Sequence, residues 1–192
     1  MEGIPNNEGK KSAQYPQVAE EILERVKVDQ DMRSKSLDDD STWDENVDAE
    51  NTLAMKRIVE EIGWPTSSRV GTEAAHGAWL LVQHADHDPE FQEYCLERMK
   101  SEAGSEVNAA DIAYLEDRIR VNTNRPQIYG TQFYETRDEE TGQTLVAYGP
   151  RPIENIEQLD ERRASVGLEP FEEYRKMITG MYHPELLDKE GE

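Results

Sequence analysis

The chain has 192 residues, and its 42 aspartate and glutamate residues outnumber its 21 lysine and arginine residues, which gives a formal net charge of −21. This charge argues against binding of nucleic acid through a basic face and against attraction to an anionic membrane, so neither partner is expected. Cys95 is the only cysteine, which excludes an intrachain disulfide and a zinc site built from several cysteines, and favours a cytoplasmic protein. No apolar run is long enough for a membrane span.

The two ends of the chain differ in composition from the part between them. Residues 1–15 are polar and contain Pro5 and two glycines, so they are predicted to be a disordered tail. Residues 184–192 are predicted to form a loose acidic tail. The intervening residues 16–183 are predicted to form a single helical domain, which is long enough to bury one core.

The segment 72–87 is predicted to form a buried central helix. Between Thr72 and Ala85 the only formal charge is Glu73, and apolar residues surround the helix on nearly all sides. The segment nevertheless ends in polar residues, which a core does not bury without a hydrogen-bond partner or a function. These residues are Gln83, His84, Asp86 and His87. The end of this helix is therefore the first candidate for a functional site.

Further helices are predicted where apolar residues recur every three or four positions. They cover about 16–34, 49–62, 89–101, 108–121 and 155–166, and a last helix begins at Pro170. Residues 131–137 and 143–149 have strand patterning on either side of a turn with Gly142, which predicts a small β-hairpin that packs on the helices. The predicted fold is mainly α, a bundle of about six to seven helices around 72–87 with a hairpin in 131–149.

In several predicted helices a polar residue continues the apolar stripe that should face the core. These residues are Asp29, Arg33, Asn51, Gln83, His84, Asp117 and Arg163. The segment 129–132, with Tyr129 and Gln132 at its ends, adds a tight loop rich in hydrogen-bonding groups. If the stripes face one core, their polar positions converge, and such a buried network is either satisfied internally or functional.

The same positions carry a resemblance to a known family. Over roughly residues 18–180 the chain resembles uncharacterised bacterial helical proteins that are defined as a domain of unknown function. The residues that carry the resemblance are Asp29-Gln30 with Arg33, Asn51, Gly63-Trp64-Pro65, Trp79 with Val82-Gln83-His84-Ala85-Asp86, Phe91-Gln92, Leu115 with Asp117-Arg118, Gln127 with Tyr129-Gly130-Thr131-Gln132, and Arg162-Arg163 with Gly167-Leu168. The resemblance implies no reaction, but it favours a functional site because its residues are largely the polar ones above.

His84 is the strongest candidate for a general acid or base, because histidine changes its protonation state near neutral pH. Asp86 and Asp117 are predicted as its catalytic partners. The alternative is a core histidine that is hydrogen-bonded to a carboxylate for structural reasons.

Four arginines are candidates for a clamp on a phosphate or carboxylate. They are Arg33, Arg118, Arg162 and Arg163, and the residues predicted to position a substrate beside them are Asp29, Gln83, Tyr129 and Gln132. The alternative is that these arginines form ion pairs with Asp29 and Asp117.

Two functions follow from these candidates. The first is an enzyme that acts on a small anionic molecule by hydrolysis or group transfer. The second is a non-enzymatic acidic helical module, a binding or inhibitor protein whose polar core is structural. A divalent metal held by His84, His87, Asp88 and Asp117 is a further alternative for the site, since residues three or four apart share one face of a helix.

Overall fold

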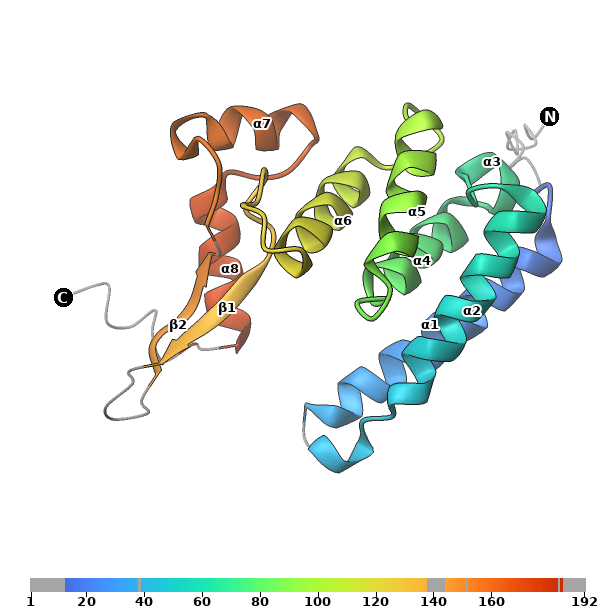
Figure 1. The fold of residues 1–192 in the computed structure, drawn as a ribbon, viewed down its shortest axis with the longest axis horizontal. Coiled ribbons are helices and arrows are strands. Elements are labelled where there is room, and N and C mark those ends of the chain that lie inside the picture. Colours follow the sequence, from blue (N-terminus) through green and yellow to red (C-terminus); the bar gives the residue numbers. More distant parts are fainter. Residues whose placement is uncertain (1–12, 38, 138–143, 151, 183, 185–192) are drawn as a thin grey trace, which may run out of the picture. The chain divides into compact units, whose positions relative to one another are not determined.

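The structure is a computed structural model that describes residues 13–37, 39–137, 144–150, 152–182 and 184. In this part of the chain it has eight α-helices and two β-strands, so the predicted mainly helical class is confirmed (Figure 1). The chain divides into two compact units, Met1–Leu81 and Val82–Glu192. Most of both predicted tails, and the predicted turn at Gly142, lie outside the described residues.

The first unit is built on two long helices, α1 (Pro16–Ser36) and α2 (Glu45–Ile62), which contact each other. A 3-10 turn, η1 (Asp40–Thr42), connects them, and α3 (Ser67–Val70) and α4 (Thr72–Gln83) follow. The core between these helices contains Ile22, Met55 and Ile58, all without solvent exposure. Gly77 allows α4 to approach α1, because a Cβ atom there would lie 2.9 Å from Val26 and 3.2 Å from Ile22.

The second unit starts with the last two residues of α4, and its first complete helices are α5 (Pro89–Ser101) and α6 (Ala109–Asn122), which contact each other. Two strands follow, β1 (Phe133–Arg137) and β2 (Thr144–Pro150), and then η2 (Ile156–Gln158), α7 (Leu159–Ser165) and α8 (Phe171–Tyr182). The strands pair antiparallel, with Phe133 opposite Pro150, and α8 contacts both β2 and α7. The predicted hairpin is therefore confirmed, although β1 starts two residues later than expected.

The core of the second unit includes Cys95, Met99 and Leu115, all fully buried. Burial raises the pKa of the Cys95 thiol well above its ordinary value, which keeps it protonated and unreactive. None of the described helices is long and apolar enough to cross a membrane.

The main error in the predicted helices is the end of the central one. The segment 72–87 was expected to be helical throughout, but α4 ends at Gln83. The chain then turns, with the amide of Ala85 donating to Val82 at 3.1 Å and the amide of Asp88 donating to Ala85 at 2.9 Å. Asp88 begins the next helix, because its carboxylate accepts from the amide of Phe91 at 3.0 Å.

Candidate functional site

In the second unit, His84 directly follows the last residue of α4, and its side chain is partly exposed. Because the helix has ended, His84 and His87 do not share a helical face, and the spacing argument that paired them as metal ligands is wrong. Among the described residues, no group of His, Cys, Asp or Glu side chains placed to hold one ion includes His87, Asp88 or Asp117.

Asp86 is the centre of a polar cluster that joins this turn to α5 and α6. Its carboxylate accepts from Nε and Nη2 of Arg118, with the Nε bond at 2.9 Å, and from Asn122 at 2.8 Å and Gln92 at 3.4 Å. Partial burial of the Asp86 carboxyl favours its neutral form, but the hydrogen bonds and charge of Arg118 outweigh this effect, so the pKa of Asp86 is lowered. The ion pair stays accessible, with exposed fractions of 33% for the Arg118 side chain and 42% for Asp86.

Gln132 extends the same cluster from the loop before β1. Its side-chain oxygen accepts from Nη1 of Arg118 at 3.1 Å, and its side-chain nitrogen donates to the hydroxyl of Thr131 at 3.1 Å. In the described structure the Arg118 guanidinium therefore donates to side chains, which can rotate away from it.

Two buried glutamine oxygens lie in this part of the second unit without a hydrogen-bond partner among the described residues. They are Oε1 of Gln83, a residue that is 7% exposed, and Oε1 of Gln92, a residue that is fully buried. The orientation of the Gln92 amide is fixed, because its nitrogen donates to the carbonyls of Val82 at 3.1 Å and Gln83 at 3.3 Å. Both oxygens can therefore still accept a hydrogen bond.

Asp117 is fully buried on α6 and holds the loop that precedes β1. Its carboxylate accepts from the amides of Ile128 at 2.7 Å, Tyr129 at 3.2 Å and Thr131 at 3.0 Å, and from the Thr131 hydroxyl at 3.0 Å. Burial raises the pKa of the Asp117 carboxyl, and these hydrogen bonds oppose that effect. The contacts identify Asp117 as a support for the loop.

Arg162 and Arg163 hold the opposite side of the same loop through its carbonyl groups. Arg162 donates to Ile128 at 2.9 Å and also to the carbonyls of Glu154 and Asn155. Arg163, which is fully buried, donates to Tyr129 at 2.7 Å and to the carbonyl of Glu169. These backbone contacts place both arginines in the scaffold that fixes Tyr129.

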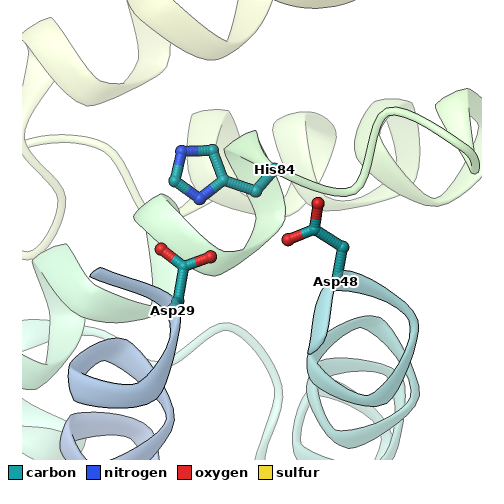
Figure 2. A group of neighbouring side chains, drawn as sticks. All are labelled: Asp29, Asp48 and His84. Atoms are coloured by element: carbon teal, nitrogen blue, oxygen red, sulfur yellow. The ribbon is translucent and has the colours of Figure 1, made fainter. Parts of the chain in front are cut away.

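A second polar cluster lies in the first unit, where Arg33 connects α1 to α2. Its Nε donates to Asp29 at 3.1 Å, and its Nη2 donates to Asp48 at 2.5 Å. The guanidinium also lies 5.0 Å from the ring centre of Trp43. Figure 2 shows the carboxylates of Asp29 and Asp48 on neighbouring helices, pointing to the same side, and one oxygen of each lies within 4.8 Å of the other.

Three members of these clusters were not predicted as site residues, namely Asp48, Gln92 and Asn122. Asp48 lies three residues before Asn51, so helical spacing places both polar residues on the same face of α2, where they continue its apolar stripe. Gln92 and Asn122 have no comparable signal, because their contact with Asp86 depends on how the turn 84–88 folds back on α5 and α6.

A family model matches residues 16–186 of the chain and is described as a family of unknown function (DUF6624). The chain belongs to this family. The predicted resemblance to a domain of unknown function is thereby confirmed. No curated protein and no solved structure matches the sequence. The family description names no activity, so the two polar clusters are the features of this chain that bear on its function.

Proposed function

We propose that this protein is an enzyme that acts on a small anionic substrate by hydrolysis or group transfer, with His84 as general acid or base. The observation that carries the proposal is the state of Arg118 in the second unit. Its side chain is one third exposed and donates to the side chains of Asp86 and Gln132, whereas Arg162 and Arg163 donate to backbone carbonyls. Side-chain partners can move aside for a ligand, but backbone partners cannot move without disrupting the loop.

A substrate phosphate or carboxylate would bind Arg118 in place of Asp86. Because 42% of the Asp86 side chain is exposed, its carboxylate can turn toward water, and the exchange of one anion for another keeps the charge of the ion pair balanced. The planar guanidinium donates two parallel hydrogen bonds, which suits it to phosphate and carboxylate groups.

The remaining groups of the cluster suit a reaction that involves water or a hydroxyl. His84 lies two residues before Asp86 in the same turn and is partly exposed, which supports a role in proton exchange. The side-chain oxygens of Gln83 and Gln92, which lack a hydrogen-bond partner among the described residues, would accept from a substrate hydroxyl or from an attacking water. Gln132 would hold the substrate beside Arg118.

The alternative is a binding or inhibitor module without catalysis. It is favoured by Asp117, Arg162 and Arg163, which hold the loop 127–132 and have hydrogen bonds typical of a structural network. We also propose a cytoplasmic location, because Cys95 is the sole cysteine and is buried in the reduced state.

The test is a thermal-shift screen of the full chain with inorganic phosphate, pyrophosphate, nucleotides and small carboxylates. A ligand at a hundred times its dissociation constant stabilises the folded state by about 2.7 kcal/mol, which raises the melting temperature by about 5–11 °C for a chain of this size. We expect Arg118→Gln to weaken the binding of the stabilising anion by about tenfold or more. The control is Arg125→Gln, which removes the same charge from an exposed arginine paired with Glu93 in the same unit.

Turnover then separates the two functions. The stabilising anion is incubated with the wild-type protein and with His84→Gln, and its conversion is followed by NMR. Conversion by the wild-type protein that His84→Gln abolishes supports the enzyme. Binding without conversion supports the module, and stabilisation by no anion, or by the same anion equally in Arg118→Gln, refutes the proposed role of Arg118.

A further inference from the structure

The polar cluster of the first unit has the features of a cation site. We propose that α1 and α2 hold a hard divalent cation of the Mg²⁺ or Mn²⁺ class between Asp29 and Asp48, with Asn51 as a third oxygen ligand. This site lies within the first unit and is separate in its residues from the proposed anion site around Arg118.

The geometry of the two carboxylates suits such an ion. Asp29 lies on α1 and is fully buried, and the Asp48 side chain on α2 is 17% exposed, so the pair is shielded from bulk water but reachable from it. One oxygen of each carboxylate lies within 4.8 Å of the other, and both groups point to the same side (Figure 2). Two oxygens bound to one Mg²⁺ or Mn²⁺ at about 2.1 Å lie at most about 4.2 Å apart. A small movement of the two carboxylates toward each other would therefore bring both oxygens into contact with the ion.

The charge of the cluster favours a cation over an anion. Arg33 is shared by both carboxylates, so the three side chains carry two negative charges and one positive charge, a sum of −1. Arg33 donates to Oδ1 of each carboxylate, and Gln30 donates to Oδ2 of Asp29 at 2.7 Å, whereas no described residue donates to Oδ2 of Asp48. That oxygen is open to an ion, and carboxylate oxygens are the ligands that hard divalent cations prefer. An anion brought to this pair would instead be repelled by both carboxylates.

Asn51 gives an independent indication of a ligand. Its side chain is 4% exposed, and Nδ2 has no hydrogen-bond partner among the described residues. It lies three residues after Asp48 on α2, and residues at this spacing project from the same face of a helix. A buried amide nitrogen without a hydrogen-bond partner is rare in folded proteins and indicates a missing ligand or water. Rotation of the amide by half a turn exchanges its nitrogen and oxygen, and Oδ1 then becomes a ligand for the ion.

Mn²⁺ alone, titrated against the full chain, tests the site. Bound and free Mn²⁺ are distinguished by electron paramagnetic resonance, and Mg²⁺ is added as a competitor. We expect a single Mn²⁺ per chain, displaced by Mg²⁺, and a loss of affinity of about tenfold or more in Asp48→Asn, because the charge of the ligands sets the affinity of such sites. The control is Asp31→Asn, which removes the same charge from an exposed, lysine-paired position on α1 and should leave binding unchanged.

Asn51→Asp provides an opposite test, because it adds a carboxylate to the proposed ligand set. In a cation site it should increase Mn²⁺ affinity, and the melting temperature of this variant should rise with added Mn²⁺. Circular dichroism establishes that each variant is folded. The proposal is overturned if the folded wild-type chain binds no stoichiometric Mn²⁺, if Asp48→Asn binds it as tightly as Asp31→Asn does, or if Asn51→Asp gains no affinity.

Discussion

Replacement of Asp117 by asparagine tests the assignment of this buried carboxylate as the support of the loop before β1. In the wild-type protein both oxygens accept hydrogen bonds, Oδ1 from Ile128 and Tyr129, and Oδ2 from Tyr129 and from the amide and hydroxyl of Thr131. An asparagine side chain has one oxygen and one nitrogen at these positions. Whichever way the amide is turned, at least one backbone N–H of the loop faces a donor.

The cost follows from the number of bonds lost. A hydrogen bond to a charged group contributes about 1.5–3 kcal/mol, so the loss of about two such bonds, each at the lower end of the range, destabilises the fold by about 3 kcal/mol. For a chain of this length the corresponding fall in melting temperature is about 6–12 °C. Urea unfolding followed by circular dichroism measures the loss as a lower midpoint with an unchanged slope.

Asp86→Asn is the matched control, because it makes the same chemical change at a carboxylate that is 42% exposed. Exposed ion pairs contribute at most about 1 kcal/mol, so this variant should be clearly more stable than Asp117→Asn. Equal stability of the two variants, or a loss below about 1 kcal/mol in Asp117→Asn, would show that the loop does not depend on Asp117.

Three further results are expected. Arg118→Gln should lower the free energy of unfolding by about 1 kcal/mol or less. Because Arg118 lowers the pKa of Asp86 in the folded protein, the full loss should be seen above the ordinary aspartate pKa of about 3.9. It should vanish as the pH falls through the lowered pKa of Asp86. Urea unfolding across this range checks it, and a loss that survives full protonation contradicts it. Gly130→Ala should destabilise the fold by about 2 kcal/mol in a thermal melt, because its φ is 64° and a Cβ there would lie 2.9 Å from Phe171. His84→Gln should leave the melting temperature nearly unchanged while it abolishes anion-dependent turnover; a large loss of stability with unaltered anion binding would make His84 a core residue.

Much of the fold could be predicted because helix signals are local. Asp88 and Pro89 marked the start of α5, and the predicted end near Ser101 agrees with the structure. The end of α4 could not be predicted in the same way. Ala85 and Asp86 are compatible with a helix, and the turn at this point is accompanied by a bond between Asp86 and Arg118, 32 residues away. Such a contact leaves no periodic signal in the sequence.

The candidate site was predicted as a set of polar positions, but the use of each position was not. Asp117 was recognised because its carboxylate continues an apolar stripe. That pattern is equally compatible with a carboxylate that contacts a substrate and with one that accepts hydrogen bonds from backbone amides. Only the position of the Tyr129 and Thr131 amides distinguishes these uses. Asp48 was missed for a different reason, since it follows a strongly acidic loop in which a single aspartate carries little information.

Buried atoms that lack hydrogen bonds help to separate scaffold from site. Nη2 of Arg163 has no hydrogen-bond partner among the described residues, but the guanidinium lies 5.0 Å from the ring centre of Tyr174, and this cation–π contact accounts for it. Oε1 of Gln92 and Nδ2 of Asn51 have no such compensation in the described structure. A polar network selected only for stability would not leave such buried amide atoms without a hydrogen bond, because each unsatisfied atom costs about 1–3 kcal/mol. Gln92 contacts Asp86, the partner of Arg118, and Asn51 follows Asp48 by one helical turn, so these uncompensated atoms belong to the two clusters that we propose as ligand sites.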